Sequence, residues 1–162
     1  MPFKRRGARM DEYIKSKRAL WTHRDASFDG EFVSFSQMNC SPKPHNGCVP
    51  IIIGGHSPKA AQRAANLGDG FFPATGTQTD ISPIIQIMHE EAERIDRDPK
   101  TIELTTGCPG ALPGSKVDPL SAVEERITAG VDRIALPVNA FSDNIEEQLT
   151  SFSENVIQKI NG

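Results

Sequence analysis

The chain has 162 residues, 24% of them charged, and a formal net charge of −3. A chain of this length suits a single domain, and so small a charge indicates neither a nucleic-acid-binding surface nor an acidic tail. No apolar run reaches the ~20 residues that cross a bilayer, the charged first residues do not resemble a secretory signal, and three scattered cysteines favour the reducing cytoplasm over a disulfide scaffold.

Residues 1–49 are expected to form a leading helix, a hairpin and a loop. Apolar side chains recur at helical spacing from Ala8 to Thr22, with charged residues between them. The period changes between Phe28 and Phe35, where the pair Asp29-Gly30 is typical of a tight hairpin turn. Residues 36–49 are rich in proline, asparagine and glycine, which predicts an ordered but irregular loop.

From Pro50 onward, short apolar strands alternate with helices, which makes residues 50–162 a run of four β/α units. Strands are predicted at residues 51–54, 70–73, 102–106 and 131–137, and helices at 58–67, 80–95, 118–129 and 144–160. Such alternation indicates right-handed crossovers and a parallel α/β sheet. Four parallel strands suit either a small open sheet with helices on both faces or half of an eight-stranded barrel, and composition does not decide between these.

The turn after the first of these strands carries the strongest functional signal. A β-branched run from Ile51 ends in Gly54 and Gly55, and His56 and Ser57 then lead into a helix. N–H groups beside the positive end of a helix favour a phosphate or a carboxylate. The alternative interpretation is a tight strand-to-helix turn that needs only glycine conformations. The spacing alone gives the two interpretations equal weight.

Short motifs follow one another in order through nearly the whole chain. They are Arg9-Met10-Asp11-Glu12-Tyr13-Ile14, Arg18-Ala19-Leu20-Trp21-Thr22, Ser27-Phe28-Asp29-Gly30-Glu31-Phe32, Pro42-Lys43-Pro44, Pro50-Ile51-Ile52-Ile53-Gly54-Gly55, Ala60-Ala61, Arg63-Ala64-Ala65, Gly68-Asp69-Gly70-Phe71 and Arg97-Asp98-Pro99. Each motif is weak alone, but in this order they resemble the bacterial-luciferase-like monooxygenase family, especially the members that use the deazaflavin coenzyme F420.

The resemblance implies a TIM (β/α)8 barrel, of which this truncated luciferase-like domain supplies the last four β/α units. It also implies an oxidoreductase that transfers hydride or, as a monooxygenase, activates O₂ at a reduced flavin or deazaflavin. Coenzyme F420 is the expected cofactor and FMN the alternative. Family members draw their catalytic residues from the first half of the barrel, so no residue here is expected to be catalytic. A catalytically inactive half-barrel or assembly module, completed by a second copy in a homodimer or by a complementary N-terminal half, is the alternative.

The resemblance places the glycine pair against the cofactor phosphate, at the carboxyl ends of the strands where such barrels bind their ligands. Two neighbours in that turn and two residues after the next strand complete the expected contacts. The predicted cofactor-binding residues are Gly54, Gly55, His56, Ser57, Thr75 and Gly76.

Other candidate residues are expected to have structural roles. For Asp69, hydrogen bonds to nearby backbone are favoured over catalysis. Cys108 is expected to be a buried thiol or one at the rim of the barrel, not a nucleophile, because no histidine is near it in sequence. Cys40, His45, Cys48 and His56 could suggest a zinc site, but they lack the short spacing of a structural one, so no metal is expected.

Overall fold

The computed structural model of the protein describes residues 4–73, 80–141 and 144–161. Helix α1 (Arg6–Thr22) is followed by an antiparallel hairpin of β1 (Ala26–Asp29) and β2 (Ser34–Met38). The carboxylate of Glu12 on α1 accepts hydrogen bonds from the N–H groups of residues 31, 32 and 33, at 3.0, 2.7 and 2.6 Å. A backbone turn with three inward N–H groups needs such an acceptor, so Glu12 holds the hairpin against α1.

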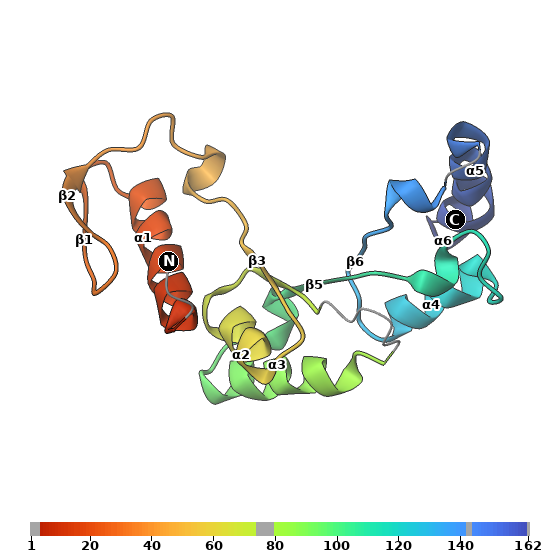
Figure 1. Cartoon of the computed structure of the whole chain (residues 1–162), viewed down its shortest axis with the longest axis horizontal. Helices are drawn as coiled ribbons and strands as arrows, with labels where there is room; N and C mark the ends of the chain where they lie inside the picture. Colours follow the sequence, from red (N-terminus) through yellow and green to blue (C-terminus); the bar gives the residue numbers. More distant parts are fainter. Residues whose placement is uncertain (1–3, 74–79, 142–143, 162) are drawn as a thin grey trace.

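Four parallel strands form the main sheet, in the order β3 (Ile52–Gly54), β4 (Gly70–Phe72), β5 (Glu103–Thr106) and β6 (Arg133–Ile134). Each of the first three is followed by a helix, namely α2 (Pro58–Leu67), α3 (Ser82–Arg94) and α4 (Pro119–Thr128). After β6 come α5 (Ile145–Phe152), a π-helical stretch (Ser153–Ile157) and α6 (Gln158–Asn161). Figure 1 shows these elements spread along an open arc, with α1 and α6 at opposite ends.

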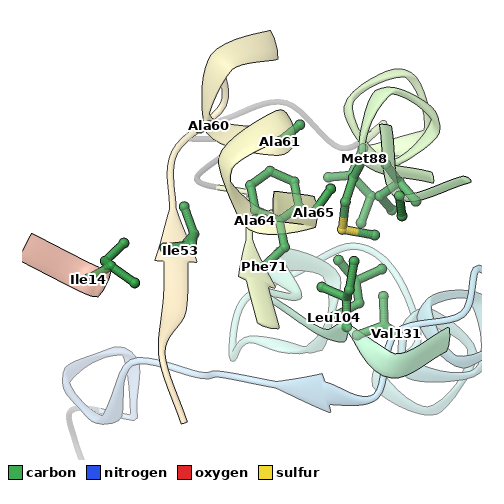
Figure 2. Close-up of a cluster of buried hydrophobic side chains, with 14 residues drawn as sticks. Ile14, Ile53, Ala60, Ala61, Ala64, Ala65, Phe71, Met88, Leu104 and Val131 are labelled. Carbon is green, nitrogen blue, oxygen red and sulfur yellow. The ribbon is translucent and has the colours of Figure 1, made fainter. Parts of the chain in front are cut away.

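The helices cover one face of the sheet. The side chains of Ile53, Phe71 and Leu104 are at most 7% exposed and pack into a core with α2 and α3 (Figure 2). Ile52, which points to the opposite face, is 39% exposed, and within the described ranges no helix lies over that face (Figure 1). The fold is therefore the expected α/β half-barrel, and the open sheet with helices on both faces is excluded.

Helix starts follow the local sequence closely. Ser57 and Asp118 are the N-caps of α2 and α4, and a proline occupies the first turn of each helix. The Asp118 carboxylate accepts a hydrogen bond from the backbone N–H of Ser121 at 2.9 Å, and this bond lowers the pKa of Asp118. None of the described helices is both long and apolar enough to cross a membrane.

The last strand is shorter than the sequence predicts. A strand was expected over residues 131–137, but β6 covers only Arg133–Ile134. Among the described residues β6 is the last strand of the sheet and has a partner strand on one side only, and Pro137 has no N–H with which to extend the ladder.

Candidate functional site

The candidate site is the turn between β3 and α2, at the carboxyl end of β3. The chain leaves the strand at Gly54, passes Gly55 and His56, and enters the helix at Ser57. The Ser57 hydroxyl accepts a hydrogen bond from the Ala60 N–H at 3.3 Å. The structure therefore brings four of the predicted contact residues together in one exposed turn.

Gly55 is required by the backbone of this turn. Its φ of +134° is a conformation that other residues rarely adopt, and a Cβ atom there would lie 3.0 Å from the Cβ of Ala60. Its N–H donates to the Phe72 carbonyl at 3.1 Å, so this donor is used within the sheet. Gly55 shapes the turn and has no spare N–H for an anion.

Gly54 is different, because its backbone angles and its surroundings would accept a side chain. A Cβ atom at this position would meet no heavy atom within 4 Å. Gly54 lies on the same face of β3 as the exposed Ile52, which is the face without helices. The glycine thus leaves an open surface at the strand end that packing within the described residues does not explain.

The start of α2 offers unused hydrogen-bond donors. The N–H groups of His56, Ser57 and Lys59 find no acceptor among the residues that the structure describes. These three residues are exposed, and the first turn of α2 contains no acidic residue. The partial positive charge of the helix start is therefore not neutralised locally, which suits an anion.

The remaining candidates divide clearly. Thr75 and Gly76 lie outside the described residues. The carboxylate of Asp69 accepts hydrogen bonds from the Ile51 N–H at 2.7 Å and from Arg18 at 2.8 Å, which is a structural role. Cys108 is 3% exposed, and its Sγ lies 3.5 Å from the Ala122 carbonyl. Its thiol is buried, as expected.

Sequence reasoning did not single out Lys59. Its position two residues after the N-cap makes it a basic residue of the first helical turn. The signal that could have identified it is a lysine where helices usually carry aspartate or glutamate.

The comparisons with known proteins agree with this architecture. The sequence profile described as "Luciferase-like monooxygenase" matches residues 1–113. An uncharacterized protein of Mycobacterium tuberculosis is 30% identical over 169 residues, covering 99% of this chain and 56% of the relative. An F420-dependent glucose-6-phosphate dehydrogenase of Gordonia bronchialis is 32% identical over 103 residues, covering 62% of this chain and 30% of the relative.

Two solved structures show the same fold. The coenzyme F420-dependent tetrahydromethanopterin reductase of Methanopyrus kandleri has a TM-score of 0.77 at 11% identity, covering 94% of this chain and 63% of that one. An F420-dependent secondary alcohol dehydrogenase, solved with an F420–acetone adduct, has a TM-score of 0.56 at 25% identity, covering 66% and 33%. The chain spans little more than half the length of the first relatives it matches. With the profile covering most of its length, the chain belongs to the luciferase-like monooxygenase family.

Proposed function

We propose that this chain binds the phosphate end of coenzyme F420 at the β3–α2 turn, as part of a flavin- or deazaflavin-dependent oxidoreductase. The observation that carries the proposal is the set of unpaired N–H groups at residues 56, 57 and 59, next to the open position at Gly54. A phosphate at this place would accept hydrogen bonds from the backbone and benefit from the helix dipole and the Lys59 ammonium.

F420 is favoured over FMN by the names of the similar proteins. The Gordonia enzyme, the Methanopyrus reductase and the secondary alcohol dehydrogenase are all named as F420-dependent. When bound, F420 would supply hydride transfer, and the protein would position it. We assign no catalytic residue to the described part of this chain, whose contribution is to hold and orient the phosphate.

The proposed enzyme needs a larger cofactor-binding surface than the four parallel strands supply. The β3–α2 turn lies at one end of the sheet, so a ligand anchored there would extend over the edge of β3 as well as over its neighbours. We therefore propose that activity requires a completing unit, which would be a second copy or a complementary N-terminal half. The competing function is that of an inactive assembly module. It is favoured by the outer edges of β3 and β6, which pair with no strand in the part of the chain that the structure describes.

Replacement of Gly54 by valine tests the phosphate site. The new side chain fits the strand, since no atom lies within 4 Å of its Cβ and β-branched residues suit strands. It would fill the open surface beside the free N–H groups, and we expect the Kd for F420 to rise at least about tenfold, or about 1.4 kcal/mol. Fluorescence titration with F420, and in parallel with FMN, measures this change.

Ile52→Val is the matched control, because it alters the same face of the same strand two residues from the turn and should leave the Kd unchanged. Thermal unfolding of both variants checks that the fold is kept. Equal affinity of Gly54→Val and the unaltered chain would remove this turn from the binding site. Absence of F420 and FMN binding, even with a completing unit present, would favour the inactive module.

A further inference from the structure

A cavity of about 680 Å³ lies between helix α4 and the helices that follow β6. Figure 1 shows these helices together at one end of the arc, away from the β3–α2 turn. The floor of the cavity includes Ala111, Phe141 and Val156, which are at most 3% exposed. Small-molecule sites are commonly clefts of this size with an apolar lining and a few polar groups. The cavity is therefore a candidate ligand site separate from the one proposed for the cofactor.

The cavity uses one side of helix α5. Glu147, Gln148 and Ser151 line it, at the spacing of a single helix face. Ile145 and Leu149 are 45% and 41% exposed, are not among the lining residues, and lie on a different face of α5. A further unit that packed on these two apolar side chains would therefore contact a different face of α5 from the one that lines the cavity.

The π-helical stretch Ser153–Ile157 contributes to the wall of the cavity. The Gln158 N–H donates to the Ser153 carbonyl, five residues earlier. Asn155 lines the cavity, and its Nδ2 donates to the Ser151 carbonyl at 2.9 Å and to the Ser151 hydroxyl at 3.2 Å. Such π-helical turns are rare and occur often at functional sites. The polar side chains of this wall are thus already held by bonds within the helix.

Among the described residues, the charged groups that line the cavity are two carboxylates and one ammonium. Asp118 accepts hydrogen bonds from the Ser121 N–H and hydroxyl, each at 2.9 Å. These bonds lower the pKa of Asp118, and the nearby Lys159 ammonium lowers it further. Glu147 accepts a hydrogen bond from the Asn144 amide, but no ion pair joins it to another described residue. The negative charge of Glu147 is left for a ligand.

Gln148 adds a hydrogen-bond acceptor that is not used. Its Oε1 atom is buried and finds no donor within the described part of the chain, although the residue lines the cavity. A buried oxygen without a donor has lost its bonds to water and gained none in exchange. Turning the amide toward the cavity would give this oxygen a donor only if the bound molecule carries one.

Two aromatic rings belong to the same cavity. Phe141 and Phe152 line it, with their ring centroids 6.0 Å apart in an edge-to-face arrangement. Aromatic faces attract organic cations. A carboxylate without an ion pair, an amide oxygen without a donor and two aromatic rings together favour a cation that carries N–H donors.

We propose that the cavity between α4 and α5 binds a small primary ammonium compound with an aromatic or aliphatic group. The hydrocarbon group would pack on the floor of Ala111, Phe141 and Val156, and the ammonium would donate to Glu147 and Gln148. Phenethylamine has this chemistry and is the probe for the test. Its binding requires neither F420 nor a completing unit, so this chain alone can be tested whatever the outcome of the F420 titration.

Isothermal titration calorimetry of the full 162-residue chain with phenethylamine measures the affinity. Phenylpropionate is similar in size but negatively charged, and it should bind at least about tenfold more weakly, a difference of about 1.4 kcal/mol. Gln148→Leu removes the acceptor and should weaken phenethylamine binding at least about tenfold. Gln148→Glu keeps an acceptor and should retain the binding. Thermal unfolding checks that each variant keeps its fold.

Glu147→Gln and Glu146→Gln form a matched pair, because the two residues are neighbours in the first turn of α5 and, of the two, Glu147 alone lines the cavity. Loss of an exposed charge should weaken phenethylamine binding about two- to fivefold at Glu147 and leave it unchanged at Glu146. Equal affinity for phenethylamine and phenylpropionate would overturn the proposal. So would absence of saturable phenethylamine binding, equal effects of the two glutamate substitutions, or equal affinities of Gln148→Leu and Gln148→Glu.

Discussion

At the scale of single residues, two aspartates repeat one device at the start of alternate strands. The backbone N–H of Asp69 donates to the Ile51 carbonyl at 2.8 Å, and that of Asp132 donates to the Leu104 carbonyl at 2.9 Å. Each carboxylate then accepts a backbone N–H of the neighbouring strand, from Ile51 at 2.7 Å and from Leu104 at 2.8 Å. Each aspartate thereby fixes the start of one strand to its neighbour.

The two aspartates differ in whether they form an ion pair. Replacing each carboxylate by an uncharged amide should therefore lower the free energy of unfolding by different amounts. Asp69 also binds Arg18 at 2.8 Å, whereas no ion pair joins Asp132 to another described residue. Asn at either position can still accept one N–H. We expect Asp69→Asn to lower the free energy of unfolding by about 1–2 kcal/mol and Asp132→Asn by less, as measured by urea denaturation. Equal losses would mean that Arg18 contributes nothing through Asp69.

The candidate site shows what sequence reasoning can and cannot supply. The glycine pair and Ser57 were found because a β-branched run, two glycines and a helix cap are local signals. The different roles of Gly54 and Gly55 could not be predicted, because they depend on the Phe72 carbonyl and on Ala60. The roles of Thr75 and Gly76 stay predictions, since these residues lie outside the described ranges.

At the scale of elements, the contact between α2 and α3 is reinforced by a polar cluster. Glu91 on α3 accepts hydrogen bonds from Arg94 at 2.7 and 2.8 Å and from Asn66 on α2 at 2.6 Å. These bonds, first those from Arg94 and then that from Asn66, lower the pKa of Glu91 from 4.5 to about 2. The cluster therefore depends on the ionised carboxylate.

The lowered pKa predicts how the contact responds to acid. The stabilisation is fully present above pH 4.5, and it is lost as the pH falls from there through about 2. Glu91→Gln should lower the melting temperature at pH 7, and the difference from the unaltered chain should vanish toward pH 2. Thermal melts across this pH range measure the effect. Glu90→Gln, its neighbour on α3, is the control, and a difference that persists at pH 2 would contradict the prediction.

The element boundaries were predictable where a local cap marks them. Helix α2 begins at Pro58 and ends at Leu67 as predicted, because Ser57 and Gly68 bound it. The last strand was predicted too long, because its length depends on a second neighbouring strand and not on its own β-branched residues. The choice of a half-barrel over an open sheet likewise depends on which face the helices cover, and four alternating units leave that choice open.

At the scale of the whole molecule, the buried side chains of the described residues form two clusters. The first joins α1, α2, α3 and the strands, and the second joins α4 to the C-terminal helices around Cys108, Val123 and Val156. Ile134 of β6 packs against both clusters. Because the two clusters have only this one hydrophobic side chain in common, unfolding of one end of the arc should have little effect on the other. We therefore expect local unfolding to differ between the two ends.

Hydrogen exchange can measure this independence. Met88 is 1% exposed in the first cluster, and Met88→Ala should cost about 2–5 kcal/mol through the cavity it leaves. We expect faster amide exchange in α2 and α3, with the amides of α4 and α5 unchanged. Phe152→Ala, in the second cluster, should show the reverse pattern. Uniform acceleration along the chain in both variants would show a single cooperative core.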